Sequence, residues 1–294
     1  MSKTVAITIG DIYGIGIDIL INCWKKKQIN NFILFTDIVV LKKYLKKRKI
    51  KLKVNKINNE YIILDSKNYK FNVFSYHSKS DEDNTYRSLE YAYKFCKKKI
   101  CIGIITLPLR KDKIKKKVDK KFIGQTEFFQ KIDNKRNSNM ILYHDNIIVS
   151  PLTTHIEIKK LPKIVSNKLF LKNQITNLYQ TLIKDFNIIN PKVVISGFNP
   201  HSGENGLIGT EEKEILKPMM NKLRKKGINI DGPLSADSIL LKSNLKKYDC
   251  FIFLFHDQAL IPFKYISQFS GVNFTGNLNI IRTSPDHGTA YNLI

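Results

Sequence analysis

Short apolar runs, separated by longer polar and lysine-rich stretches, recur along the 294-residue chain. Each run has the length of a β-strand and is bounded by glycine, proline, asparagine or aspartate, as buried strands commonly are. The pattern therefore predicts buried strands over residues 4–9, 31–36, 100–106, 139–143, 192–198 and 250–255.

Helical periodicity occupies the segments between these runs. In 168–187, apolar residues recur every three or four positions and form one stripe. A second such pattern lies in 83–98. A third helix is predicted over 211–226, with Thr210 as its N-cap and Glu211 and Glu212 in its first turn. Strands that alternate with helices predict an α/β protein.

A domain boundary is expected in the polar, lysine-rich stretch 109–123. Placing it at 115 gives an N-terminal α/β domain over 1–115 and a second α/β domain over 116–294. The length allows two domains of ordinary size, each with a buried core.

The charge balance admits two interpretations. There are 50 Lys and Arg residues against 25 Asp and Glu, a net charge of +25. A nucleic-acid-binding protein would cluster such cations against phosphates. Here the excess is spread along the whole chain, and no zinc-finger spacing or RNA-recognition motif occurs. The pattern favours a metabolic enzyme with lysine-rich solvated faces, whose field would still attract an anionic substrate.

Cysteine usage and hydropathy indicate the compartment. The four cysteines form no CxxC pair and are too few for a disulfide framework, which is typical of a reducing environment. No apolar stretch reaches 18 residues, and the N-terminal apolar run is too short for a signal peptide. We therefore expect a cytoplasmic protein without a membrane span.

Three histidines follow predicted strands. His201 comes after 192–198, His256 directly after 250–255, and His155 after the apolar segment 147–152. Ligands of open α/β sheets gather beyond the carboxyl ends of strands. Three imidazoles with an open position would make a catalytic metal site, which Asp257 could support as a hydrogen-bonding neighbour. Because their separations match no local metal motif, three unrelated hydrogen-bonded loop residues are the alternative interpretation.

Two further segments carry candidate chemistry. In GDIYGIGID (10–18), Gly14 and Gly16 follow a strand and can open a helix, but Ile19 breaks the G-x-G-x-x-G pattern. A tight strand-to-helix turn explains them equally well. In the last fifth of the chain, Arg282 is the best anion ligand, because a guanidinium can hold a phosphate or carboxylate with two parallel hydrogen bonds.

Taken together, the motifs resemble the 4-hydroxythreonine-4-phosphate dehydrogenases of pyridoxal phosphate biosynthesis. The resemblance runs in order over most of the chain. It is carried by T-x-G-D-x-x-G-I-G (8–16), T-x-P-x-x-K (106–111), G-x-T-E-F-F (124–129), T-T-H (153–155), G-x-N-P-H-x-G-E-x-G-x-x-G-x-E-E (197–212), G-P-x-x-A-D (232–237), H-D-Q (256–258) and R-T-S-x-D-H-G-T-A (282–290).

The resemblance implies two α/β/α domains with the active site in a cleft, as in isocitrate and isopropylmalate dehydrogenases. The implied reaction is an NAD- or NADP-dependent oxidation of a phosphorylated secondary alcohol, followed by loss of CO₂. The family also implies a homodimer with the active site at the subunit interface. A divalent metal (Zn, Mg or Co) would be held by residues from both subunits.

The same resemblance assigns residues to roles. The implied metal ligands are His155, His201 and His256, and the implied nucleotide contacts are His287, Gly288, Thr289 and Ala290. Asp237 and Asp257 are implied as proton-handling or hydrogen-bonding groups. The implied substrate contacts are Gln125, Thr126, Lys264, Asn273 and Arg282.

The chain departs from the family pattern at Gln125, where the family usually has histidine, and it stops at Ile294, soon after H-G-T-A. We expect the segment that returns to the first domain in relatives to be short or missing. Two alternatives stay open. One is a sister dehydrogenase acting on phosphorylated threonate or erythronate. The other is a catalytically impaired relative that acts as a basic binding protein.

Overall fold

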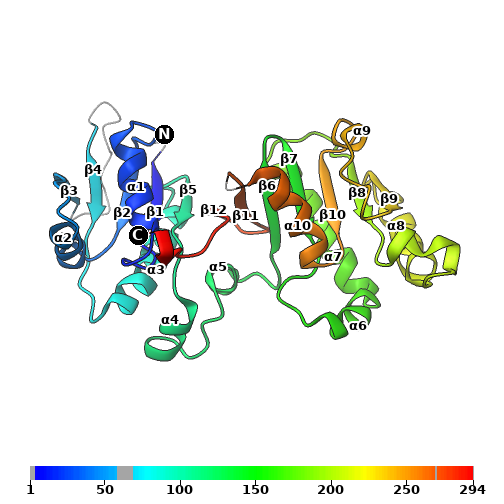
Figure 1. Cartoon of the computed structure of the whole chain (residues 1–294), viewed down its shortest axis with the longest axis horizontal. Coiled ribbons are helices and arrows are strands. Elements are labelled where there is room, and N and C mark those ends of the chain that lie inside the picture. The colour runs from blue at the N-terminus through cyan, green and yellow to red at the C-terminus, as the bar shows by residue number, and fades with distance from the viewer. Residues whose placement is uncertain (1–3, 58–68, 269, 294) are drawn as a thin grey trace. The chain divides into compact units, whose positions relative to one another are not determined.

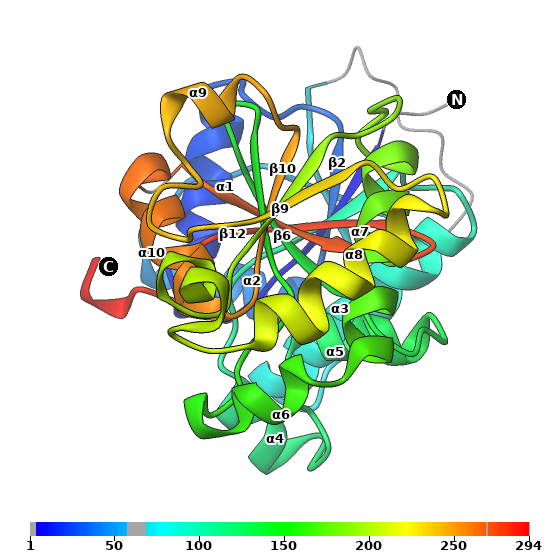
Figure 2. The ribbon, with the colours of Figure 1, turned by 90° about the vertical axis from the view of Figure 1, so that its right-hand side faces the viewer.

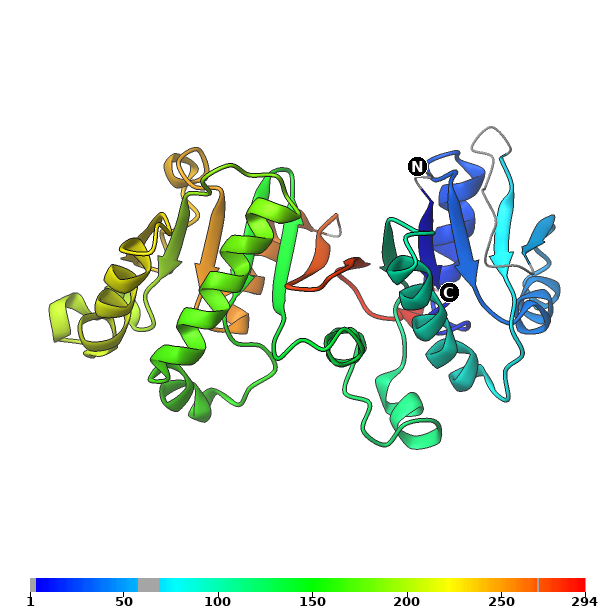
Figure 3. The ribbon, with the colours of Figure 1, turned by 180° about the vertical axis from the view of Figure 1, so that it is seen from behind.

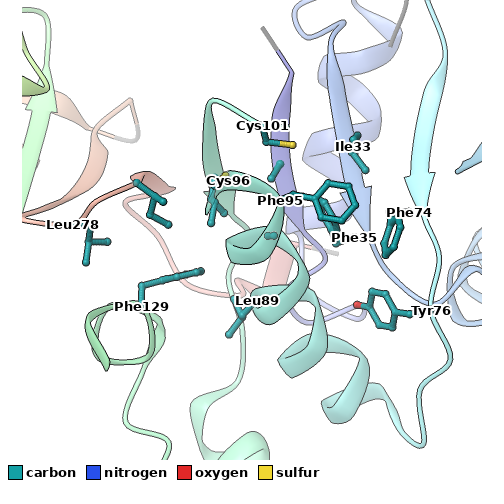
Figure 4. Close-up of a cluster of buried hydrophobic side chains, with 14 of the residues drawn as sticks. Ile33, Phe35, Phe74, Tyr76, Leu89, Phe95, Cys96, Cys101, Phe129 and Leu278 are labelled. Atoms are coloured by element: carbon teal, nitrogen blue, oxygen red, sulfur yellow. The ribbon is translucent and has the colours of Figure 1, made fainter. Parts of the chain in front are cut away.

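The computed structural model describes residues 4–57, 69–268 and 270–293 and divides the chain into two compact units (Figure 1). The first unit comprises Met1–Asn134 and Leu278–Ile294, and the second comprises Lys135–Asn277. This division differs from the boundary predicted at residue 115. The reason is packing: Phe129 and Leu278 lie in one buried cluster of the first unit (Figure 4), to which Ile280 also belongs, so both segments are part of that unit.

The strands of the first unit form a parallel array in the order β3-β4-β2-β1-β5-β12. The predicted strands at 4–9, 31–36 and 100–106 are confirmed as β1, β2 and β5. The bounds are β1 Val5–Thr8, β2 Phe32–Phe35, β3 Val54–Ile57, β4 Phe71–Phe74, β5 Gly103–Thr106 and β12 Ile281–Pro285.

Successive residues of these strands face opposite sides of the sheet. On β2, Ile33 and Phe35 join one buried cluster, whereas Phe32 and Leu34 join another. Helix α3 covers the first of these faces, which is turned toward the viewer in Figure 3. The helices of this unit are α1 Gly16–Lys25, α2 Ile38–Lys47, α3 Asp81–Lys97, α4 Lys111–Lys117 and α5 Gln125–Ile132, with the short turn η4 Tyr291–Leu293.

The strands of the second unit follow the order β11-β6-β7-β10-β8-β9. Strand β6 is antiparallel to both of its neighbours, and the remaining pairs are parallel. This mixed sheet lies between α7 and α10 (Figure 2). The strand bounds are β6 Asn139–His144, β7 Ile147–Pro151, β8 Val193–Ser196, β9 Ile230–Leu234, β10 Cys250–Phe253 and β11 Val272–Gly276.

The helices of the second unit include the predicted one at 168–187, which is confirmed as α7. The bounds are η1 Ile158–Lys160, α6 Leu161–Val165, α7 Lys168–Lys184, η2 Pro200–Gly206, η3 Glu212–Leu216, α8 Lys217–Arg224, α9 Lys242–Leu245 and α10 His256–Ser267. No helix among the described residues is both long enough and apolar enough to cross a membrane.

The helix predicted over 211–226 starts at the expected residue, although not as a regular α-helix. Its first turn is the wide turn η3, which Glu211 precedes with helical backbone angles and without a side-chain cap hydrogen bond. The Glu214 amide donates to the Thr210 carbonyl at 2.8 Å, so Thr210 stands just before the first helical residue, as predicted. Glu212 is buried, and its carboxylate binds the preceding loop at Phe198 and Asn199. The regular helix α8 then starts at Lys217.

Candidate active-site residues in the two units

Two of the three strand-end histidines lie together in the second unit. Strands β7 and β10 are parallel neighbours, so the loops that leave their carboxyl ends start side by side. The ring centroids of His155 and His256 are 5.7 Å apart. The Thr153 hydroxyl fastens the two loops by donating to the Leu254 carbonyl at 2.8 Å. A cavity of about 150 Å³ adjoins the pair and is also lined by Asp257.

Asp257 fixes the state of the His256 ring. Its carboxylate lies 2.6 Å from the Nδ1 atom of His256. A carboxylate accepts a hydrogen bond, so this contact assigns the shared hydrogen to Nδ1 and directs the Nε2 atom away from Asp257.

His201 lies in the loop that follows β8, as the strand pattern indicates. Residues 201–205 all have positive φ angles, including 50° at His201 and 78° at Gly203. A run of left-handed residues needs support from outside the run. The buried Glu212 carboxylate gives this support through the backbone N–H groups of Phe198 and Asn199. The role of Glu212 in supporting this loop was missed, because its place in the sequence predicted only that it opens the next helix.

The structure does not gather all three histidines. Among the residues that it describes, no three His, Cys, Asp or Glu side chains lie close enough to hold a metal ion. His201 instead lies near Asp237: the Ser235 hydroxyl and, more weakly, the charge of His201 lower the pKa of that aspartate. A catalytic zinc site uses three protein ligands. One chain therefore brings together two imidazoles whose chemistry fits such an ion, and the set is incomplete without a third ligand.

The first unit holds a buried arginine. Arg282 is 2% exposed and sits on β12, next to β5 in the sheet. Its guanidinium donates to the Thr106 hydroxyl from Nη2 at 2.6 Å and from Nε at 3.1 Å. It also donates to the side-chain oxygen of Gln125 at 2.7 Å and to the Thr126 hydroxyl at 3.4 Å. Burial lowers the pKa of Arg282 to about 10, so the guanidinium stays charged at neutral pH.

The predicted substrate contacts thus divide between the units. Gln125, Thr126 and Arg282 come together in the first unit. Lys264 is exposed on α10 and Asn273 is half-buried on β11, both in the second unit. Thr106, which binds Arg282, was not singled out, because its contact spans 176 residues of sequence and leaves no local pattern.

The segment 287–290 packs on the turn after the first strand. The carbonyl of Thr289 accepts a hydrogen bond from the Ile15 amide at 3.0 Å. A Cβ atom at Gly14 would lie 3.2 Å from the Thr289 side chain, so glycine permits the close approach. The Tyr291 hydroxyl donates to Asp11, and the His287 Nδ1 atom lies 2.9 Å from the Gly288 carbonyl oxygen. The first-strand turn and the H-G-T-A segment therefore form one structural element.

Known proteins are similar to this chain in both sequence and fold. A family model described as the pyridoxal phosphate biosynthetic protein PdxA matches residues 28–294. The 4-hydroxythreonine-4-phosphate dehydrogenase of Sulfurihydrogenibium sp. is 33% identical, over 98% of this chain and 91% of the relative. The D-threonate 4-phosphate dehydrogenase of Salmonella typhimurium is 33% identical, over 72% of this chain and 64% of the relative.

Among solved structures, that of the 4-hydroxythreonine-4-phosphate dehydrogenase from Klebsiella pneumoniae matches with a TM-score of 0.86 and 26% sequence identity. The match covers 99% of this chain and 93% of that one. The resemblance stated from the motifs is confirmed, as is the α/β fold class. The chain belongs to the family of the pyridoxal phosphate biosynthetic protein PdxA.

Proposed function

We propose that the protein oxidises 4-phosphooxy-L-threonine with NAD⁺ or NADP⁺ as hydride acceptor. Loss of CO₂ from the resulting β-keto acid gives 3-amino-2-oxopropyl phosphate, a step in pyridoxal 5'-phosphate biosynthesis. The observation that carries the proposal is the His155–His256 pair at adjacent strand ends, in a chain that belongs to this family. Membership of the family supplies the reaction, and the pair supplies the chemistry that the reaction needs.

The proposed metal site comprises His155, His201 and His256. A divalent cation held there supplies positive charge where the substrate hydroxyl loses its proton and where negative charge develops as CO₂ departs. Imidazole ligands suit zinc and cobalt better than magnesium. Asp257 holds the proton on Nδ1 of His256, and Asp237, near His201, is the proposed proton-handling group.

Substrate and nucleotide take other residues in this proposal. Arg282 and Thr126 bind an anionic group of the substrate, together with Lys264 and Asn273. The buried, charged guanidinium supports this role, because charge-assisted hydrogen bonds to phosphate or carboxylate are strong and directional. Residues 287–290 contact the nucleotide. The four free cysteines support a reducing compartment such as the cytoplasm.

Turnover tests the proposal directly. Purified protein is incubated with 4-phosphooxy-L-threonine, NAD⁺ or NADP⁺, and Zn²⁺, Co²⁺ or Mg²⁺, and the absorbance of the reduced nucleotide is followed. We expect reduction that requires both substrate and metal, with release of CO₂. His256→Ala should abolish it, whereas His77→Ala should leave it intact, because His77 is exposed in the first unit. Metal-independent reduction by His256→Ala would refute the metal assignment.

The third metal ligand defines the proposed quaternary structure. Because one chain gathers only the His155–His256 pair among its described residues, we propose that a second copy completes the site in a homodimer. Mixing the inactive His201→Ala and His256→Ala variants then produces some sites with all three ligands, so activity should reappear. If the histidines acted within one chain, mixing would restore nothing.

A sister activity on 4-phospho-threonate or 4-phospho-erythronate is the second candidate, favoured by Gln125 and by the Salmonella relative. These acids carry a hydroxyl in place of the amine of 4-phosphooxy-L-threonine. Comparing kcat/KM for the three substrates on one preparation separates the two candidates. The second is adopted if either sugar acid has the higher kcat/KM.

A further inference from the structure

The Arg282 guanidinium is held by a specific set of oxygens. Its Nη2 atom makes two hydrogen bonds, to the Thr106 hydroxyl at 2.6 Å and to the Gln125 side-chain oxygen at 2.7 Å. An Nη nitrogen carries two hydrogens. Both therefore have protein partners, and one edge of the guanidinium is fixed to the first unit.

Gln125 connects this edge to the backbone. Its side-chain Nε2 donates to the Leu107 carbonyl at 2.9 Å, while its Oε1 accepts from Arg282. The network admits one orientation of the amide, since a flipped amide would set a donor against the guanidinium and an acceptor against the carbonyl. Gln125 thus links the guanidinium of Arg282 to the backbone of the loop between β5 and α4.

We propose that Gln125 is a positioning residue for Arg282, rather than a ligand of the substrate. The inference rests on the proposed function, in which Arg282 binds an anionic group of the phosphorylated substrate. Gln125 restricts the guanidinium to one orientation before the anion arrives. An arginine side chain loses rotamer entropy when it binds an anion, and the hydrogen bond to Gln125 imposes part of that loss before binding.

The Gln125 side chain acts as a donor and an acceptor at once, and a histidine could perform the same two functions. A neutral imidazole offers one nitrogen that donates and one that accepts, which are the two functions that Gln125 performs. The contacts at this position therefore require a residue that donates toward Leu107 and accepts from Arg282. Methionine has a similar length but neither function.

The test compares substitutions at this position. We expect Gln125→Met to raise KM for 4-phosphooxy-L-threonine about 10-fold, a loss of about 1.4 kcal/mol in binding, with a smaller change in kcat. Gln125→His should keep KM within about 3-fold of wild type at pH 8, because histidine keeps both the donor and the acceptor. Gln180→Met, on an exposed glutamine of α7, controls for the substitution itself. Unchanged KM in Gln125→Met would overturn the proposal.

A double-mutant cycle separates positioning from direct contact. If Gln125 acts through Arg282, then Gln125→Met changes KM little when Arg282→Lys is already present. Additive effects would show that Gln125 binds the substrate itself and would overturn the proposal. Thermal unfolding of each variant identifies any that fail to fold, and Arg282→Met replaces Arg282→Lys if that variant does.

Calorimetric binding of inorganic phosphate gives a readout that is independent of turnover. We expect weaker phosphate binding in Gln125→Met, wild-type binding in Gln125→His, and unchanged binding in Gln180→Met. A wild-type protein that binds phosphate but turns over none of the substrates refutes the proposed function and leaves this inference standing. Equal phosphate affinity in the wild type and Gln125→Met overturns the inference whatever the turnover.

Discussion

Glu212 binds Asn199 twice: one carboxylate oxygen accepts from the Asn199 backbone amide at 2.8 Å, and the other from its side-chain amide at 3.0 Å. The Phe198 amide adds a third hydrogen bond at 2.7 Å. Glu212 is 2% exposed, and a carboxylate buried to this extent needs such donors. The loop that carries His201 therefore starts from a fixed point, two residues before the histidine.

Glu212→Ala should destabilise the second unit and weaken metal binding at the site proposed for His155, His201 and His256. The change removes the acceptor of two backbone N–H groups and of one hydrogen of the Asn199 side-chain amide, whose nitrogen still donates to Glu211 at 2.7 Å. Losing the acceptors costs about 3 kcal/mol or more in the free energy of unfolding. Urea unfolding measures this loss, and metal content per subunit reports the displacement of His201. Glu214→Ala is the matched control, because Glu214 is exposed in the same turn. Equal stability of the two variants would show that Glu212 does not anchor the loop.

Much of the fold could be predicted from hydrophobic runs, which located β1, β2, β5, β6, β8 and β10. Apart from β7, whose apolar segment was noted only as the one before His155, the strands that were missed do not form continuous apolar runs. In β4, Asn72 interrupts the run although all four residues are buried, and β9 contains Gly232 and Pro233. Burial in these strands comes from neighbours far along the chain, which a local pattern does not record.

The sequence indicated some residues that lie together at the candidate site, but not the groups that hold them. Motifs pointed to Gln125, Thr126 and Arg282, and the structure brings these three together. Thr106 and the Leu107 carbonyl escaped notice, because their part in the site depends on β12 pairing beside β5. The pairing of β12 with β5 also explains why residues 278–294 belong to the first unit, which a boundary at residue 115 did not anticipate.

Gly10→Ala should be much more destabilising than Gly227→Ala. Both glycines have positive φ angles, 64° and 81°. A Cβ at Gly10 would lie 2.5 Å from the Pro108 carbonyl oxygen, whereas a Cβ at Gly227 would meet nothing within 4 Å. Gly227→Ala thus carries only the cost of the left-handed backbone, about 1 kcal/mol. We expect Gly10→Ala to cost about 2 kcal/mol more in urea unfolding.

The Gly10→Ala substitution also tests whether Gln125 positions Arg282, because it disturbs the Leu107 carbonyl to which Gln125 donates. The same Cβ would press on the Leu107 carbonyl carbon at 2.9 Å, and the Leu107 carbonyl oxygen accepts from Gln125. Phosphate binding should therefore weaken in Gly10→Ala and stay unchanged in Gly227→Ala. Equal losses of stability in Gly10→Ala and Gly227→Ala would mean that the backbone at 107–108 moves aside at no measurable cost in free energy.

Cys23 should be the cysteine that reacts first with iodoacetamide in the native protein. It is half-buried, whereas Cys96, Cys101 and Cys250 are buried. Burial raises the pKa of Cys101 to about 12 and also raises the pKa of Cys96 and Cys250, so these three thiols stay protonated at pH 8. The thiolate is the reactive form. Peptide mass spectrometry after brief labelling checks the order, with urea-unfolded protein as the fully labelled reference; early native labelling of Cys250 would contradict it.

Tyr291→Phe should raise KM for the nucleotide without changing KM for the substrate. The Tyr291 hydroxyl donates to Asp11, on the same turn whose Ile15 amide donates to the Thr289 carbonyl. The Arg110 guanidinium lies over the Tyr291 ring, 5.9 Å from its centroid. Removing the hydroxyl releases one attachment of the segment 287–290 but keeps the aromatic packing. An ordered loop binds its ligand with less entropy loss, so we expect an increase of about 5-fold, equivalent to about 1 kcal/mol. Steady-state kinetics with each partner varied in turn give both constants. An equal rise in both KM values would show that Tyr291 contributes to general stability rather than to the order of residues 287–290. Tyr265→Phe is the control for loss of a tyrosine hydroxyl alone, because the Tyr265 side chain is 81% exposed.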